Sequence, residues 1–189
     1  MTRLFVNACM REDSRTERIA RAWIERAWGA DRYEELRIGE MDIRPLDSRS
    51  IALYNDAVAR ATYDDALFDV AKQFAAADDI LMAAPVWNYG IPAKLHDYLE
   101  LVCSQGVTFD ITDTGEYASL CRAQRLTFVS TAGGPIPAGV DDHAFGYVRT
   151  LSNAFWHIPE VQFVYAESLD MLGADVEAKL LAALESHAS

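Results

Sequence analysis

The chain has 189 residues, 51% hydrophobic and 24% charged, which favours a single domain over residues 1–189 with one well-buried core. Its formal net charge of −12 argues against binding nucleic-acid phosphates or anionic membranes, and indicates a solvated acidic surface or a basic partner. No segment has the roughly 18 consecutive apolar residues of a membrane span, and no signal peptide is recognisable, so a cytoplasmic protein is expected.

Several common kinds of site find no support in the sequence. The three cysteines are widely spaced and form no CxxC pair, which favours reduced thiols over a disulfide framework or a zinc site. The histidines show no metal-ligand spacing, so no metal is expected. There is no GxGxxG, GKS or GKT phosphate motif, and no GxSxG elbow of a serine hydrolase.

The first apolar run predicts a strand over residues 4–6, a polar loop over residues 7–16, and then a helix that ends near Gly29. Ser14 or Thr16 stands at the N-cap position of that helix. Free amides at a helix start favour a phosphate, and Arg11 and Arg15 add positive charge. An ordinary capped helix with solvated arginines explains this loop equally simply.

The next segments lead to the centre of the chain. Residues 33–38 alternate apolar and polar side chains and predict an edge strand. Residues 39–62 show little periodicity and are expected to form a long connection, of the kind that often carries function. Residues 63–77 predict a helix that leads into the buried strand 80–84.

A strand-to-helix corner follows, over residues 84–95. Pro85 ends the apolar run, and Pro92 suits the first turn of a helix that continues to about residue 103. Between them lie Trp87, Asn88, Tyr89 and Gly90, which offer two aromatic rings, one amide and a close approach to the backbone. The corner is therefore a candidate ligand site, although Trp87 and Tyr89 are also compatible with ordinary core aromatics.

The remaining pattern is irregular over residues 106–120, a strand over 125–130, a helix over 141–157, a strand over 161–166 and a helix over 174–187. This alternation predicts an α/β fold: a flavodoxin-like, doubly wound, five-stranded parallel sheet in the order 2-1-3-4-5, with helices on both faces. In that order three loops meet at one edge, residues 7–16, 85–90 and 130–134. Together they suit a phosphorylated planar aromatic ligand.

The quoted residues resemble the FMN-dependent NADH:quinone oxidoreductases and azoreductases. The segment Ala84-Pro85-Val86-Trp87-Asn88-Tyr89-Gly90-Ile91-Pro92-Ala93-Lys94-Leu95 is similar to the flavin-binding segment of that family. Gly106-Val107-Thr108-Phe109 looks like the stretch after its next helix, and Ser130-Thr131-Ala132-Gly133-Gly134 resembles its second isoalloxazine loop. Order and spacing match over nearly the whole chain.

The resemblance implies FMN as cofactor, NADH or NADPH as electron donor, a quinone or azo substrate, two-electron ping-pong hydride transfer, and a homodimer. No catalytic side chain is expected, since the flavin carries the chemistry. The cofactor-binding residues that it implies are Cys9, Arg11, Ser14, Thr16, Pro85, Val86, Trp87, Asn88, Tyr89, Gly90, Ser130, Thr131, Gly133 and Gly134.

Two points remain open in the sequence. Cys9-Met10-Arg11 stands where that family commonly has Ser before Pro-Arg, so Cys9 is either a packed, inert thiol or a thiol activated by the helix N-terminus. The acidity also suits a non-enzymatic flavodoxin-type electron carrier or flavin-binding module, which would hardly oxidise NADH.

Overall fold

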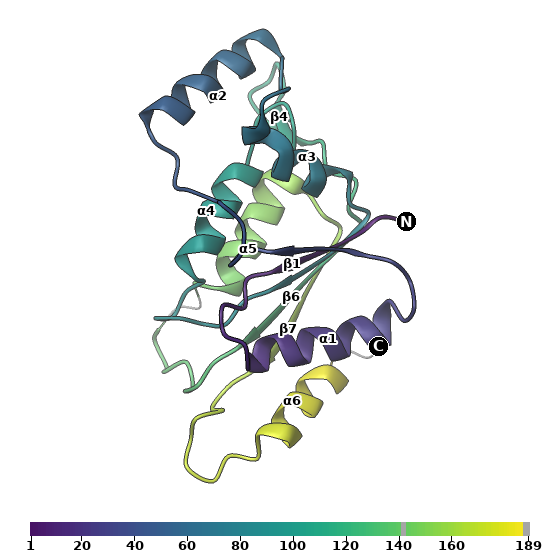
Figure 1. Cartoon of the computed structure of the whole chain (residues 1–189), viewed down its shortest axis with the longest axis vertical. Helices are drawn as coiled ribbons and strands as arrows, with labels where there is room; N and C mark the ends of the chain where they lie inside the picture. Colours follow the sequence, from purple (N-terminus) through teal and green to yellow (C-terminus); the bar gives the residue numbers. More distant parts are fainter. Residues whose placement is uncertain (141–142, 187–189) are drawn as a thin grey trace.

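A five-stranded parallel sheet in the order β2-β1-β3-β6-β7 forms the centre of the structure, a computed structural model that describes residues 1–140 and 143–186 (Figure 1). A separate antiparallel hairpin is formed by β4 and β5. Because β4 and β5 stand outside the main sheet, its order is the predicted 2-1-3-4-5, and the flavodoxin-like fold is confirmed. The strands are β1 (Arg3–Asn7), β2 (Glu34–Arg37), β3 (Asp79–Ala83), β4 (Phe109–Ile111), β5 (Tyr117–Ser119), β6 (Arg125–Thr131) and β7 (Glu160–Ala166).

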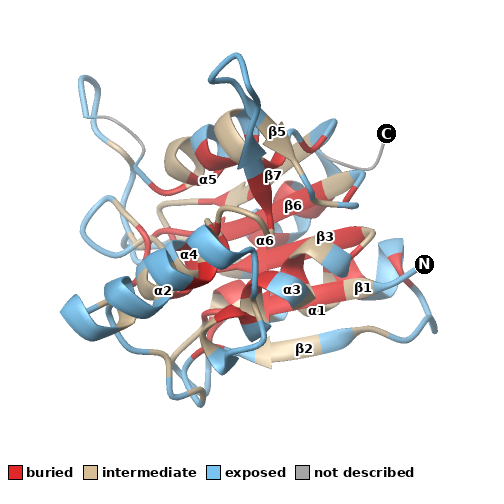
Figure 2. Ribbon diagram, turned by 90° about the horizontal axis from the view of Figure 1, so that it is seen from above, coloured by how far each residue is buried: buried red, intermediate tan, exposed pale blue. Residues whose placement is uncertain are grey.

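Helices cover both faces of the sheet. In Figure 1, α1 and α6 lie on one face, whereas α3, α4 and α5 lie on the other. Each face has its own apolar core, and the sheet between them is buried along its centre, as the red strands in Figure 2 show. The helices are α1 (Arg15–Ala27), α2 (Ser48–Arg60), α3 (Asp69–Ala76), α4 (Ala93–Val102), α5 (Phe145–Leu151) and α6 (Val176–Glu185), with a 3-10 turn at Ala66–Phe68 and a π-helical turn at Ser152–Trp156.

The strand positions follow from the apolar pattern. Every residue of β3 is buried, because this central strand has neighbours on both sides and helices on both faces. β2 contains no fully buried residue and pairs with β1 alone, as expected of an edge strand. Among the described residues, no helix is long and apolar enough to cross a membrane.

The prediction of a long connection over residues 39–62 is wrong in its second half, where α2 lies. Asp47 caps this helix through the amides of Arg49 and Ser50, and the Ser50 hydroxyl in turn accepts from the Asp47 amide at 2.8 Å. Within Ser48–Arg60, Ala57 is the only buried residue. α2 projects from the body of the fold (Figure 1), so burial imposes no helical period that the sequence could reveal.

The segment 106–120 is also more regular than predicted, because it contains the β4–β5 hairpin. The turn is closed by the Thr112 amide, which donates to the Glu116 carbonyl at 2.8 Å, and Gly115 has a φ of 85°. The helix predicted over 63–77 begins later, as a 3-10 turn capped by Asp65 that leads into α3.

Two further helices differ in their ends. The helix predicted over 141–157 is α5 followed by the π-helical turn, and its first two residues, Asp141 and Asp142, lie outside the described residues. The last helix, predicted over 174–187, is α6, and His187 also lies outside the described residues.

The amino-terminal edge of the sheet is closed by a polar network around Asp79, whose side chain is fully buried. Its Oδ2 accepts from the Trp28 indole at 2.8 Å and from Arg125 Nη2, and its Oδ1 accepts from Arg125 Nε at 3.2 Å. The Arg125 guanidinium also lies over the Trp23 ring, 5.4 Å from its centre. The network therefore ties the first residues of β3 and β6 to α1 and the residue after it.

Candidate functional site

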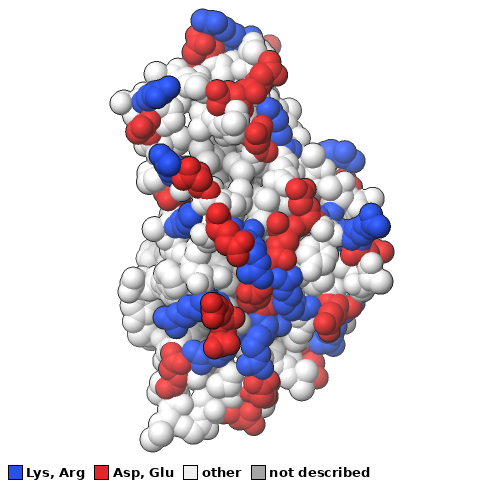
Figure 3. Space-filling model, viewed as in Figure 1, with Lys and Arg blue, Asp and Glu red and all other residues white. Residues whose placement is uncertain are grey.

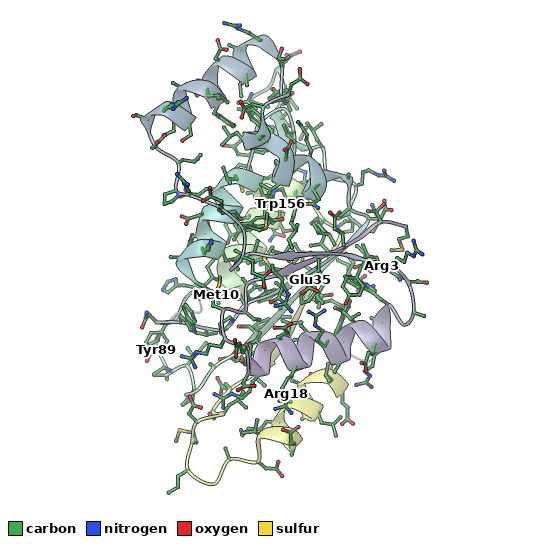
Figure 4. All side chains as sticks on the ribbon, in the orientation of Figure 1. Arg3, Met10, Arg18, Glu35, Tyr89 and Trp156 are labelled. Carbon is green, nitrogen blue, oxygen red and sulfur yellow. The ribbon has the colours of Figure 1, made fainter. Side chains whose placement is uncertain are left out.

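The three predicted loops meet at the carboxyl edge of the sheet. Figure 4 shows Met10 and Tyr89 at this edge, at the opposite end of the sheet from Arg3. A pocket of about 260 Å³, the first pocket, is lined by residues of all three loops. It brings together eight of the predicted site residues: Arg11, Ser14, Thr16, Pro85, Val86, Trp87, Thr131 and Gly133.

The floor of the first pocket is the start of α1. Ser14 is the N-cap, and its hydroxyl accepts from the Glu17 amide at 3.2 Å. Within the described part of the chain, the amides of residues 10–13, 15 and 16 donate to no acceptor. Unpartnered amides at a helix N-terminus, together with its partial positive charge, form a seat for an anion.

Side chains add two features to this seat. Thr16 is buried, and its hydroxyl hydrogen-bonds the Thr131 hydroxyl at 2.6 Å, which joins the first loop to the end of β6. Arg11 is exposed and makes no hydrogen bond or ion pair with any described residue. The pocket therefore combines a rigid hydroxyl pair with one guanidinium that is free to meet a ligand.

The corner after β3 closes into a tight turn. The amides and carbonyls of Trp87 and Gly90 hydrogen-bond each other at 2.9 and 3.0 Å, and Asn88 and Tyr89 have φ values of 53° and 63°. Positive φ at both central positions defines a type I′ turn, for which Asn is well suited and Tyr is strained. Trp87 and Tyr89 are 37% and 45% exposed, so they are not core aromatics.

A second pocket, of about 280 Å³, lies between this turn and the Gly133-Gly134 loop. It shares Val86 and Gly133 with the first pocket, so the two form one crevice. Asn88, Tyr89 and Gly134 line this second pocket. The amides of Asn88, Tyr89, Gly133 and Gly134 have no acceptor among the described residues. The crevice thus offers amide donors in both pockets, and an exposed aromatic ring lines each: Trp87 the first and Tyr89 the second.

Three predicted residues do not line either pocket. Ser130 is fully buried and donates to the Ala84 carbonyl at 2.7 Å, so its hydroxyl already has an acceptor within the fold. Gly90 completes the turn. Cys9 lines a third, polar pocket beside β2, which shares Met10 and Arg11 with the first pocket, and its thiol lies 3.7 Å from the Ala83 carbonyl. Burial raises the pKa of Cys9 to about 12, which favours the inert thiol over the activated one.

The sequence prediction missed Asp170, which lies in the loop after β7 and lines the first pocket. The only clue in the sequence is its place just beyond a strand of the sheet, because ligands bind at the carboxyl ends of such strands. Arg15 and Asp13 also line this pocket. A larger cavity of about 470 Å³, between α2, α3 and α4, shares no residue with the crevice.

The described residues include no group of His, Cys, Asp and Glu side chains placed to hold a metal ion. His96, on α4, is exposed and packs against Tyr147, with the ring centres 4.7 Å apart. The chemistry of the crevice therefore rests on amides, hydroxyls, guanidinium groups, carboxylates and aromatic rings.

Comparisons with known proteins agree with this geometry. The family described as "Flavodoxin-like fold" matches residues 1–189. An FMN-dependent NADH:quinone oxidoreductase of Coprothermobacter proteolyticus is 30% identical over 179 residues, which cover 92% of this chain and 89% of that protein. One of Shewanella denitrificans is 40% identical over 102 residues, 54% of this chain and half of that protein. One of Lachnoclostridium phytofermentans is 35% identical over 140 residues, 73% of this chain and 67% of that protein.

Solved structures show the same architecture. An azoreductase from Bacillus anthracis strain Sterne superposes with a TM-score of 0.82 at 22% identity, covering 98% of this chain and 96% of that one. An FMN-dependent NADH-azoreductase from B. anthracis strain Ames Ancestor, solved in complex with FMN, has a TM-score of 0.80 at 18% identity, covering 98% and 95%. At these identities the likeness shows the fold.

Proposed function

We propose that this chain, which belongs to the flavodoxin-like family of FMN-dependent NADH:quinone oxidoreductases, binds FMN in the crevice and reduces quinones and azo compounds with NADH or NADPH. The observation that carries the proposal is the crevice itself. Unpartnered amides lie at the start of α1 and in the two loops that follow β3 and β6, and an exposed aromatic ring lines each of the two pockets.

The residues present fit FMN. The amides at the start of α1, with Ser14 and the free guanidinium of Arg11, supply donors for a phosphate. The turn residues Trp87 and Tyr89 supply a flat apolar surface for the ring system, and the Gly133-Gly134 loop lets backbone approach a ring edge without a side chain between. When bound, FMN would accept a hydride from the nicotinamide donor and pass two electrons to the acceptor, in a ping-pong sequence.

The chain's own contribution is to bind, orient and shield. The type I′ turn holds Asn88 and Tyr89 with their amides unpartnered, and amide donors near a flavin ring favour negative charge that develops on it. The exposed rings of Trp87 and Tyr89 would stack on a bound ring system and shield it from water. The described residues that line the crevice include no histidine or lysine, so we propose that water supplies the protons.

We propose further that the protein acts as a homodimer, as family resemblance implies. α2 supports this proposal, because a 13-residue helix with one buried residue gains little from packing within its own chain. Sedimentation velocity checks the stoichiometry: a single species near the 21.0 kDa mass of one chain would contradict it.

The test of function uses purified protein saturated with FMN. Anaerobic addition of NADH, and separately of NADPH, should bleach the flavin absorbance, and menadione or an azo dye should restore it with stoichiometric loss of the acceptor. Protein that takes up no FMN contradicts the proposal outright. Bound flavin that is not reduced by either nicotinamide would instead favour the electron-carrier alternative, which the net charge of −12 also suits.

A further inference from the structure

The loop between β7 and α6, residues 167–175, packs against the Gly133 loop at the first pocket. The Asp170 amide donates to the Gly133 carbonyl at 2.8 Å. A Cβ atom added to Gly133 would lie 2.0 Å from Asp170 Oδ2, so the carboxylate packs directly on this glycine. The loop thereby holds an acidic side chain at the wall of the pocket, where Asp170 is one of the lining residues.

Asp170 also engages the first residue of α1. Arg15 Nη2 lies 2.6 Å from Asp170 Oδ1, and Arg15 Nη1 donates to the Leu169 carbonyl at 3.0 Å. The Arg15 guanidinium is therefore directed to the β7–α6 loop, although Arg15 itself lines the first pocket. Arg11, by contrast, has no partner among the described residues.

The charges that line the first pocket cancel formally, since Arg11 and Arg15 are balanced by Asp13 and Asp170. Figure 3 shows the same interspersion of acidic and basic side chains across the face that carries α1, without a large basic patch. A phosphate monoester that enters the pocket gains contacts with helix amides but little net Coulomb attraction. Of the two carboxylates, Asp170 is the one held in place by an ion pair and a glycine contact.

We propose that Asp170 sets the anion affinity of the first pocket, because it holds Arg15 by an ion pair and adds a negative charge beside the bound phosphate monoester. The proposal rests on the proposed function, in which that monoester is the phosphate of FMN. Asp170 is a residue that limits affinity: its removal strengthens binding, whereas removal of Arg15 alone leaves an uncompensated carboxylate and weakens it.

The test is a set of dissociation constants for FMN and for riboflavin, which lacks the phosphate, measured by quenching of flavin fluorescence. Asp170→Asn keeps the shape of the side chain and should bind FMN about tenfold more tightly, with a steeper loss of affinity as salt rises. Its riboflavin affinity should equal that of the unaltered protein. Arg15→Gln should bind FMN more weakly, and the double variant should fall between the two single variants.

Glu177→Gln is the matched control. Glu177, on α6, pairs with Arg18, on α1, at 2.6 Å, and Figure 4 shows Arg18 between these two helices. Neither residue lines the first pocket, so this substitution removes a comparable ion pair and one negative charge without touching the site. Its FMN affinity should stay within about twofold of that of the unaltered protein.

The outcomes separate the two proposals. Equal FMN affinity of Asp170→Asn and the unaltered protein, or an equal gain for riboflavin, would overturn the role of Asp170 while FMN binding itself stands. If the unaltered protein binds no FMN, the proposed function fails, and calorimetric titration with inorganic phosphate decides the role of Asp170. Tighter phosphate binding by Asp170→Asn then supports it, and unchanged or absent binding in both proteins contradicts it.

Discussion

The two edges of the parallel sheet differ in whether their polar groups have hydrogen-bond partners within the fold. At the amino-terminal edge, both oxygens of the buried Asp79 are occupied by donors from Trp28 and Arg125. At the carboxyl edge, amides at the start of α1 and in the two other loops have no acceptor among the described residues. Both edges are rich in hydrogen-bonding groups, but the Asp79 network is satisfied within the fold, whereas these loop amides are not.

This difference distinguishes the edge that stabilises the fold from the edge that is available to a ligand. A buried polar network with every member partnered fixes the geometry of the elements that it joins. Amides left without partners remain tolerable only where water or a ligand reaches them, so their concentration at one edge marks that edge for binding. Substitutions at the first edge should therefore affect the free energy of unfolding, and substitutions at the second should affect ligand affinity.

The largest expected effect is at the amino-terminal edge. Asp79→Ala leaves the Trp28 indole and the Arg125 guanidinium without their buried acceptor, and should lower the free energy of unfolding by about 3–5 kcal/mol. Urea denaturation followed by far-UV circular dichroism measures this loss. Asp56→Ala is the control, since the exposed Asp56–Arg60 pair on α2 should contribute less than about 1 kcal/mol. Equal losses would remove the distinction between a saturated network and a surface pair.

At the carboxyl edge, Asn88→Gly should weaken FMN binding about tenfold, which is a change of about 1.4 kcal/mol in the free energy of binding. It should leave the urea midpoint nearly unchanged. Glycine adopts the φ of 53° without strain, so the substitution removes the side-chain amide and keeps the turn. Flavin fluorescence quenching gives the affinity. A loss of stability as large as the loss of affinity would make the turn a structural element instead of a ligand contact.

The strands and most helices could be predicted because buried elements place apolar residues at a regular spacing, which can be recognised in the sequence. The unbroken apolar run at residues 80–84 predicted a strand covered on both faces, and the loops after strands could be placed at one edge once the sheet order was known. α2 escaped prediction because only Ala57 is buried in it. Asp170 escaped because its place depends on how one loop folds back onto Gly133, which no local pattern encodes.

The same reasoning explains the predicted residues that lie outside the crevice. Ser130 lies one residue before the carboxyl end of β6, yet its hydroxyl donates to the carbonyl of Ala84, the residue just after β3, which is a tertiary contact. The period-2 alternation of a strand tells which face a residue occupies and does not tell which acceptors surround it.

A smaller effect should come from relieving backbone strain at the carboxyl edge. Tyr89 has a φ of 63°, which costs a non-glycine residue about 1 kcal/mol, so Tyr89→Gly should raise the free energy of unfolding by about that amount. The same substitution removes a ring from the second pocket and should weaken FMN binding. Ala61→Gly, at the left-handed C-cap of α2, should give the same gain in stability with no change in affinity. If Tyr89→Gly improved both quantities, the strain would have no link to binding.

The smallest effect concerns Cys9, which belongs to the first loop and yet behaves like a residue of the framework. Burial raises its pKa from the ordinary value of 9.0 to about 12. The neutral thiol therefore contributes stability that is fully present below pH 9 and is lost as the pH rises towards 12. Over this range the unfolded chain has released a proton that the folded chain retains.

Cys9→Ala should show a shallower fall of its urea midpoint between pH 9 and 11 than the unaltered protein. Other buried groups that titrate in this range, Cys103, Cys121 and Tyr98, are common to both proteins and cancel in the difference. Parallel curves would mean that the thiol ionises as readily in the folded protein as in the unfolded chain. Cys9 would then belong to the ligand-accessible carboxyl edge instead.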